Sequence, residues 1–179
     1  RIYGNTVGLK ASQTKKILHI YRRKIPFEKL ITPELGRYIT EISREINRQI
    51  GIIVDRQGII EYVIVGDTRK IVIPPLKRTR LALSRFSGLR CIHTHLDEES
   101  LSQDDFSDLA LLRLDIITAI SVSPNGLPGS VYSAHLVPEN PGKKNWEKLP
   151  PVPFARLDLN FLELVNSLES EFDRAYGFR

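Results

Sequence analysis

The feature that most constrains the fold is a change of hydrophobic period near residue 50. Over 32–50 the apolar residues recur at helical spacing behind Thr32, a residue type typical of helix caps, and we expect this helix to end at Gly51. The next two apolar runs, 50–55 and 59–66, are separated by the turn DRQG and predict a strand hairpin. A helix followed directly by a hairpin predicts a mixed α/β domain.

The remaining segments continue this alternation. Apolar and basic residues at helical spacing predict a helix over 11–24, stopped by Pro26. We expect strands at 70–74, 89–95, 116–123 and 129–137, helices at 102–115 and 157–176, and a loop or short helix at 75–88. The fold class is therefore α/β, a mixed sheet flanked by helices, with N-terminal helices and a separate C-terminal helix.

A stretch rich in proline and lysine divides the chain. The composition of 138–153, PENPGKKNWEKLPPVP, is typical of a linker. We therefore expect a domain over 1–137, a linker over 138–156 and a helix over 157–179 that leads toward another domain. A length of 179 residues allows one sizeable core. The chain begins at Arg1 and contains no methionine, so we expect a piece of a longer protein.

Positive charge is concentrated in the first half of the chain. Residues 1–90 contain 19 Lys/Arg and 7 Asp/Glu, whereas residues 91–179 contain 7 and 14. A cationic half favours a polyanionic partner such as RNA, because lysine and arginine near phosphates gain by releasing counterions. A solvated basic face with an acidic partner elsewhere in the same protein would explain the same pattern.

The sequence favours a cytoplasmic protein without a membrane segment. No apolar run is long enough to cross a bilayer, and we expect no signal peptide. Cys91 is the single cysteine, so no internal disulfide can form and a reducing compartment is expected.

The stretch CIHTHLDEESLSQDD, residues 91–105, carries the strongest chemical signal. Alternate residues of a strand share a face, so His93 and His95 should project together, about 7 Å apart along the strand. The helix that follows would bring Asp105 toward them, and two imidazoles with one carboxylate form a donor set typical of catalytic zinc. Ser102 could then hydrogen-bond a developing oxyanion. Ser102 and Asp105 also match a helix capping box, which requires no metal.

The same stretch resembles the JAMM metalloprotease signature, H-x-H-P followed by S-x-x-D on the next helix. The order of hairpin, strand, helix and strand resembles the fold of that family and of its bacterial RadC relatives. The resemblance implies a zinc ion on His93, His95 and Asp105, and cleavage of an isopeptide or related amide bond. Leu96 replaces the proline of the signature, and the interval to Ser102 is one residue shorter than usual.

The JAMM family also uses a glutamate just before the first hairpin strand as its general base. Asn47 or Gln49 falls near that position here, Glu45 is one helical turn too early, and Glu61 lies on the second hairpin strand. A missing general base removes a step that contributes roughly 10²–10⁴-fold in rate. The departures therefore favour a retired or repurposed JAMM-like fold.

Longer segments resemble the long N-terminal region of some bacterial HflX GTPases. These are GNTVGLKASQ at 4–13, YRRKIPFEKLITPEL at 21–35, SREINRQIGIIVDRQG at 43–58, EYVIVGD at 61–67, IHTHLDEESLSQDDFSDLALLRLD at 92–115 and GLPGSVYSAHLVPENP at 126–141. The resemblance implies a GTPase associated with the ribosome, mainly its large subunit. This sequence contains no G-x-x-x-x-G-K-[ST] loop, so GTP and Mg²⁺ would bind a following domain of the parent protein.

Three functions remain open on the sequence. The first is a non-catalytic accessory domain of an HflX-type GTPase that contributes to ribosome or RNA binding, or regulates the GTPase. The residues expected to face RNA are Lys15, Lys16, Arg22, Arg23, Lys24, Lys77, Arg78, Arg80, Arg85 and Arg90. The second is a JAMM-like zinc hydrolase. The third is a structural module in which the histidine strand and the Ser-x-x-Asp cap only build the core.

Overall fold

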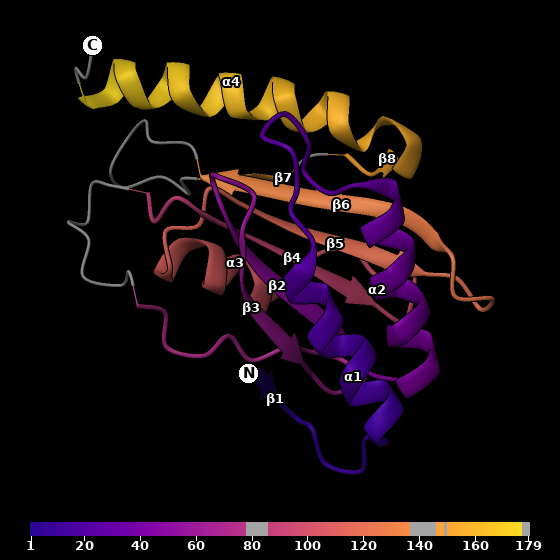
Figure 1. Ribbon diagram of the computed structural model, residues 1–179. Helices are drawn as coiled ribbons and strands as arrows, with labels where there is room; N and C mark the ends of the chain where they lie inside the picture. The colour runs from indigo at the N-terminus through magenta and orange to yellow at the C-terminus, as the bar shows by residue number, and fades with distance from the viewer. Residues whose placement is uncertain (78–85, 137–145, 149, 177–179) are drawn as a thin grey trace.

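The computed structural model describes residues 1–77, 86–136, 146–148 and 150–176. In these residues eight strands form one sheet in the order β1-β3-β2-β4-β5-β6-β7, and β8 also pairs with β6 (Figure 1). The strands are β1 (Ile2–Gly4), β2 (Ile50–Asp55), β3 (Ile60–Val65), β4 (Leu89–His95), β5 (Ile116–Val122), β6 (Pro128–Leu136), β7 (Trp146–Lys148) and β8 (Val152–Pro153). The pairs β1–β3 and β4–β5 are parallel and the other pairs are antiparallel. The expected mixed sheet is confirmed.

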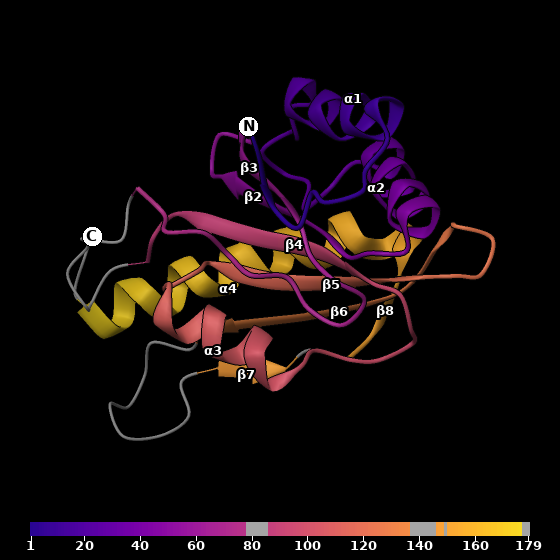
Figure 2. The same cartoon turned by 90° about the horizontal axis from the view of Figure 1, so that it is seen from below.

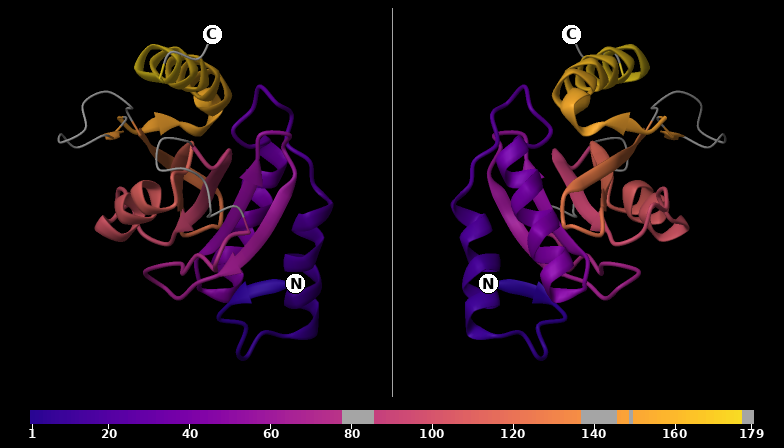
Figure 3. Two further views of the ribbon diagram at one scale, coloured as in Figure 1. Left: turned by 90° about the vertical axis from the view of Figure 1, so that its left-hand side faces the viewer. Right: turned by 90° about the vertical axis from the view of Figure 1, so that its right-hand side faces the viewer.

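Helices cover both faces of this sheet. They are α1 (Ala11–His19), α2 (Pro33–Ile46), α3 (Gln103–Leu111) and α4 (Leu157–Tyr176), with 3-10 turns at Ile20–Arg22 and Phe154–Arg156. The face covered by α1, α2 and α4 is called the α2 face, and the opposite face, covered by α3, is called the α3 face. Figures 2 and 3 show α3 across the sheet from α1 and α2. Within the described residues, no helix combines the length and the apolar character needed to cross a bilayer.

Side chains fix both ends of α2. Thr32 Oγ1 accepts a hydrogen bond from the N–H of Leu35 at 3.3 Å, which confirms the expected cap. The helix ends earlier than Gly51, because Asn47 takes a φ of 52°, in the left-handed region that asparagine tolerates. This early end leaves Gln49 outside α2, directly before β2 begins.

The expected β2–β3 hairpin is also formed. Asp55 Oδ1 accepts hydrogen bonds from the N–H groups of Gln57 and Ile59, each at 2.9 Å, and closes the turn. Gly58 takes a φ of 81°, and a Cβ at this position would collide with the carbonyl oxygen of Ile25. The turn therefore requires glycine.

The strand expected over 70–74 is not formed. Pro74 and Pro75 remove the N–H donors that a strand would need. The segment instead packs on the α3 face, where Ile71 and Leu76 are buried. Of the loop or short helix expected over 75–88, the part over 78–85 lies outside the described residues.

β4 sends alternate side chains to the two faces of the sheet. Ile92 joins the apolar cluster on the α2 face, and Cys91 joins the cluster on the α3 face. By alternation Thr94 lies on the α2 face, whereas His93 and His95 lie with Cys91 on the α3 face. Every residue of β4 is buried, so these polar side chains lie in the core.

The C-terminal part of the chain contacts the sheet through β7, β8 and α4. β7 and β8 both pair with β6, whose outer edge offers unpaired N–H and C=O groups. α4 buries Leu157, Phe161, Leu164 and Leu168 on the α2 face. The rest of the expected linker, at 138–145 and 149, lies outside the described residues.

Candidate metal centre

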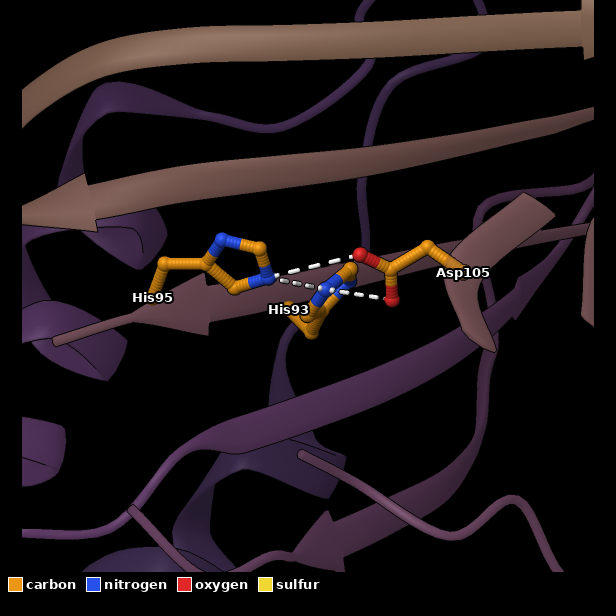
Figure 4. A group of neighbouring side chains, drawn as sticks. All are labelled: His93, His95 and Asp105. Carbon is orange, nitrogen blue, oxygen red and sulfur yellow. Dashed lines mark hydrogen bonds and ion pairs between the residues drawn. The ribbon is translucent and has the colours of Figure 1, made fainter. Parts of the chain in front are cut away.

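Two elements bring the three predicted ligands together. β4 ends at His95, so His93 and His95 project from the last part of that strand. The chain then returns over 96–102 to α3, whose third residue is Asp105. In Figure 4 the carboxylate of Asp105 points from α3 toward both imidazoles. The sequence prediction that this helix brings Asp105 to the histidine pair is confirmed.

The donor atoms of these residues converge. His93 Nε2 lies 3.0 Å from Asp105 Oδ1, and His95 Nε2 lies 3.4 Å from Asp105 Oδ2. The two Nε2 atoms are 2.9 Å apart, and the side chains are almost fully buried. One donor atom from each residue lies within 4.8 Å of the others, so the group could hold a metal ion. Two imidazole nitrogens and a carboxylate oxygen are ligands that zinc commonly takes.

Hydrogen bonding fixes the tautomer of His95. Its Nδ1 lies 3.0 Å from the carbonyl oxygen of Glu99, which can only accept, so Nδ1 carries the proton. In the neutral ring the electron pair is then on Nε2, which faces Asp105 Oδ2. An electron pair facing a carboxylate oxygen in a buried site requires a cation between them, either a proton or a metal ion. The site therefore fits a metal in its donor atoms and in its electrostatics.

The charges of the site follow from the same contacts. Burial alone would raise the pKa of Asp105, but the adjacent His93 and hydrogen bonds from both imidazoles hold it well below its ordinary value. Burial lowers the pKa of His95, but hydrogen bonding to Asp105 outweighs this effect and raises the pKa overall. On the next turn of α3, burial and the charge of Asp105 raise the pKa of Asp108 to about 6. The core thus holds an anion that attracts a cation.

The capping box and the ligand cluster share Asp105. Ser102 Oγ accepts a hydrogen bond from the N–H of Asp105 at 3.2 Å, and Asp105 Oδ2 accepts one from the N–H of Ser102 at 2.8 Å. The cap therefore orients the carboxylate that faces the histidines. Ser102 itself is exposed, and its proposed contact with an oxyanion stays a prediction.

The positions considered for a general base lie in different places. Glu45 is on the solvent side of α2, where it pairs with Lys16 at 2.7 Å, and Asn47 is the exposed C-cap of α2. Glu61 is on β3, which is separated from β4 by β2. Gln49 is only 3% exposed and precedes β2, the neighbour of β4. Of the described acidic side chains, Asp105 alone joins the histidine pair.

Most of the described residues expected to face RNA are exposed. Lys15, Arg22, Arg23 and Lys24 lie on α1 and the turn that follows, and Lys77 lies beyond β3. Lys16 is exposed but is engaged by the carboxylate of Glu45, which raises the pKa of Lys16. The predicted Arg78, Arg80 and Arg85 lie outside the described residues.

Arg90 does not belong to this cationic surface, which corrects the sequence prediction. Its position in β4 directs the side chain to the α2 face, where it is 5% exposed and its guanidinium lies 4.7 Å over the ring of Phe161. Burial lowers the pKa of Arg90 to about 10, against the opposing charges of Asp115 and Asp55. An arginine covered by α4 cannot contact a phosphate at the surface.

One member of the site has no signal in the sequence. The group that fixes the tautomer of His95 is the backbone carbonyl of Glu99, and any residue type could supply it.

Comparisons with family models, with curated proteins and with solved structures found no match for this chain. Its function therefore has to be inferred from the chain itself.

Proposed function

We propose that this chain is a non-catalytic accessory domain of an HflX-type GTP-binding protein. In this proposal the domain holds a metal ion on His93, His95 and Asp105 and contributes to binding of ribosomal RNA or to regulation of the GTPase. GTP and Mg²⁺ bind the parent protein outside this chain. The long segments that resemble HflX proteins support the assignment, and a binding role accords with the lack of a phosphate-binding loop.

The RNA-binding part of the proposal rests on four basic residues, Lys15 and the run Arg22–Lys24. These side chains are exposed, and among the described residues none of them makes an ion pair with a carboxylate. Arg23 also lies 5.8 Å over the ring of Tyr38, so a guanidinium and an aromatic ring adjoin at this surface. Unpaired cations beside an aromatic ring suit phosphates and unstacked bases.

The experiment compares two double variants that remove equal charge. Arg22→Ala/Lys24→Ala removes two of the proposed contacts, whereas Arg69→Ala/Lys70→Ala removes two exposed cations from the loop after β3. We expect the first variant to weaken binding to ribosomes or ribosomal RNA and to reduce the slope of log K against log[salt] by about 2. The second should bind like the wild type. Equal loss in both variants, or no salt-sensitive binding by the wild type, would contradict RNA binding through this surface.

A second candidate is a JAMM-like zinc hydrolase, and the convergence of His93, His95 and Asp105 favours it. A bound zinc ion would supply Lewis acidity to such a reaction. Against this function, the residue near the position of the general base is Gln49, whose amide cannot take a proton from water at neutral pH. The accessory role is therefore the better supported of the two.

Zinc-loaded protein tested on isopeptide and amide substrates separates the candidates. We expect the wild type to show no turnover. Turnover that requires zinc and disappears in His95→Ala would establish the hydrolase and overturn the non-catalytic proposal. Turnover that persists in His95→Ala would come from a contaminant, and the non-catalytic proposal would stand.

A further inference from the structure

Gln49 carries a buried polar atom that has no partner in the part of the chain that the structure describes. Its side chain is 3% exposed, and its Oε1 accepts no hydrogen bond from the described residues. Buried oxygen atoms of this kind are nearly always paired, because loss of hydration is costly in the core. The neighbourhood of Gln49 therefore has to supply an electron-pair acceptor.

The backbone of Gln49 is hydrogen-bonded to the residues that follow β3. Its N–H donates to the carbonyl oxygen of Asp67 at 2.8 Å, and its carbonyl oxygen accepts from the N–H of Gly66 at 2.9 Å. These two bonds join Gln49 to two successive residues, just beyond the last β2–β3 pair of Ile50 with Val65. The direction of the Gln49 side chain is thus set by the same alternation as in β2.

When the β2–β4 register is continued beyond its last pair, it predicts that Gln49 lies beside His95. In the antiparallel β2–β4 pair Gly51 lies opposite His93, and Ile50 N–H still contacts β4 by donating to Thr94 Oγ1 at 2.9 Å. One further step sets Gln49 opposite His95, at the about 4.5–5.5 Å typical of such pairs, with both side chains on one face. That face is the α3 face, where the three ligands converge.

Three of the four imidazole nitrogens at this place are engaged; the fourth, His93 Nδ1, has no partner among the described residues and so makes no hydrogen bond with Gln49 Oε1. The Nδ1–H of His95 donates to the Glu99 carbonyl, and the Nε2 atoms of His93 and His95 face Asp105. A metal ion held by these residues is an electron-pair acceptor, and amide oxygens are established metal ligands. Zinc in structural sites takes four protein donors, and the three residues supply three.

We propose that Gln49 Oε1 is the fourth donor of the metal centre and that the site is closed. This inference rests on the metal binding of the proposed function and deepens it. The ion then ties β4 and α3 to the residue that leads into β2, and it has no open position for water. A neutral amide as fourth ligand also contributes no base, in accord with a non-hydrolytic domain.

The test uses Co²⁺ as a spectroscopic substitute for zinc. Wild type, Gln49→Ala and Gln49→Glu are compared with Gln57→Ala, which removes an exposed glutamine from the same hairpin. We expect Gln49→Ala to bind the metal at least about tenfold more weakly. Azide, which binds open coordination positions, should shift the Co²⁺ absorption of Gln49→Ala and leave the wild type and Gln57→Ala unchanged. Gln49→Glu retains an oxygen donor and should stay insensitive to azide.

The outcomes separate this inference from the metal site itself. If azide shifts the wild-type spectrum as readily as that of Gln49→Ala, and the affinities are equal, the fourth-donor proposal is wrong while metal binding stands. If the wild type binds neither Co²⁺ nor Zn²⁺, the metal centre is wrong. Should Gln49→Ala fail to fold by circular dichroism, the azide response of the wild type still decides whether the site is closed.

Discussion

β4 directs polar side chains to both faces of the sheet, and the hydrogen bonding of these side chains differs between the two faces. On the α2 face Thr94 Oγ1 lies 2.7 Å from Ser43 Oγ and accepts from the N–H of Ile50, while Ser43 Oγ donates to the carbonyl of Arg48. Each of these groups has a partner, although Arg90 Nε and Nη2, on the same face near the start of β4, have none among the described residues. On the α3 face, one residue away, His93 Nδ1 and Gln49 Oε1 have none among the described residues.

The difference separates structure from function within one strand. A satisfied polar network in the core rigidifies the fold. Unsatisfied and mutually repelling groups in the core destabilise it, and proteins keep such groups where they bind or react. The α2 face should therefore carry stability, and the α3 face should carry metal binding. Four measurements test whether stability and metal binding belong to different faces of the sheet, and the strongest is given first.

Phe161→Ala should be the most destabilising change. Phe161 is 6% exposed, packs α4 on the α2 face and covers the guanidinium of Arg90. We expect a loss of about 3–5 kcal/mol in the free energy of unfolding, measured in urea, with metal affinity unchanged in the folded protein. Leu159→Ala, at an exposed position of the same helix, should change stability by less than about 0.5 kcal/mol. Equal small effects would mean that α4 is not part of the core.

His95→Ala should reduce zinc affinity rather than the stability of the fold. Loss of a direct ligand should weaken zinc affinity by at least about 100-fold, or about 2.8 kcal/mol. The folded metal-free protein should remain. His135→Ala removes another buried histidine, on β6, and should leave zinc affinity as it is. Competition with a chromophoric chelator measures both, and zinc binding retained in His95→Ala would refute the assigned ligand set.

Thr94→Val tests the α2-face network between the two histidines. It removes the hydroxyl that serves Ser43 and Ile50 N–H, and leaves a buried donor without a partner. We expect a loss of about 1–3 kcal/mol in stability, with zinc affinity within about twofold of wild type. The exposed Thr6→Val supplies the control. A large loss of zinc affinity would show that the two faces are coupled.

The smallest effect is the pH dependence of the metal-free protein. The pKa of His95 is raised in the folded state above its ordinary 6.5, so the stability that its protonation contributes is present at low pH. That contribution is lost as the pH rises through the raised pKa. Urea unfolding without metal should therefore show stability falling from pH 6 to 8, and His95→Ala should make this slope shallower, with the remainder due to Asp108, whose pKa is raised to about 6. Zinc affinity should change in the opposite direction, because protonated imidazole cannot bind metal.

Local sequence patterns predicted the helices, turns and strands that build the site better than the tertiary contacts made around them. The cap at Thr32, the hairpin and the approach of Asp105 to the histidines follow from periodicity and spacing, and each is found in the structure. These features depend on neighbouring residues, which the sequence displays directly. The sequence allows Ser102 and Asp105 to form a cap or part of a metal site, and the structure shows that the capped carboxylate also faces both histidines.

Other features depend on what packs from a distance. Arg90 was expected at the surface because arginine is usually exposed, yet α4 covers it from about 70 residues away. β7 and β8, at the end of the proline-rich segment, pair with the open edge of β6. Composition predicts neither event, since both are tertiary contacts that override local preference.

The central claim is that the α3 face holds a metal ion. It is tested most directly by titrating the metal-free chain with Zn²⁺ and measuring bound metal after dialysis. The structure predicts one zinc per chain in the wild type and none in His93→Ala/His95→Ala. A wild type that retains no zinc, or a double variant that retains as much, would contradict the metal centre.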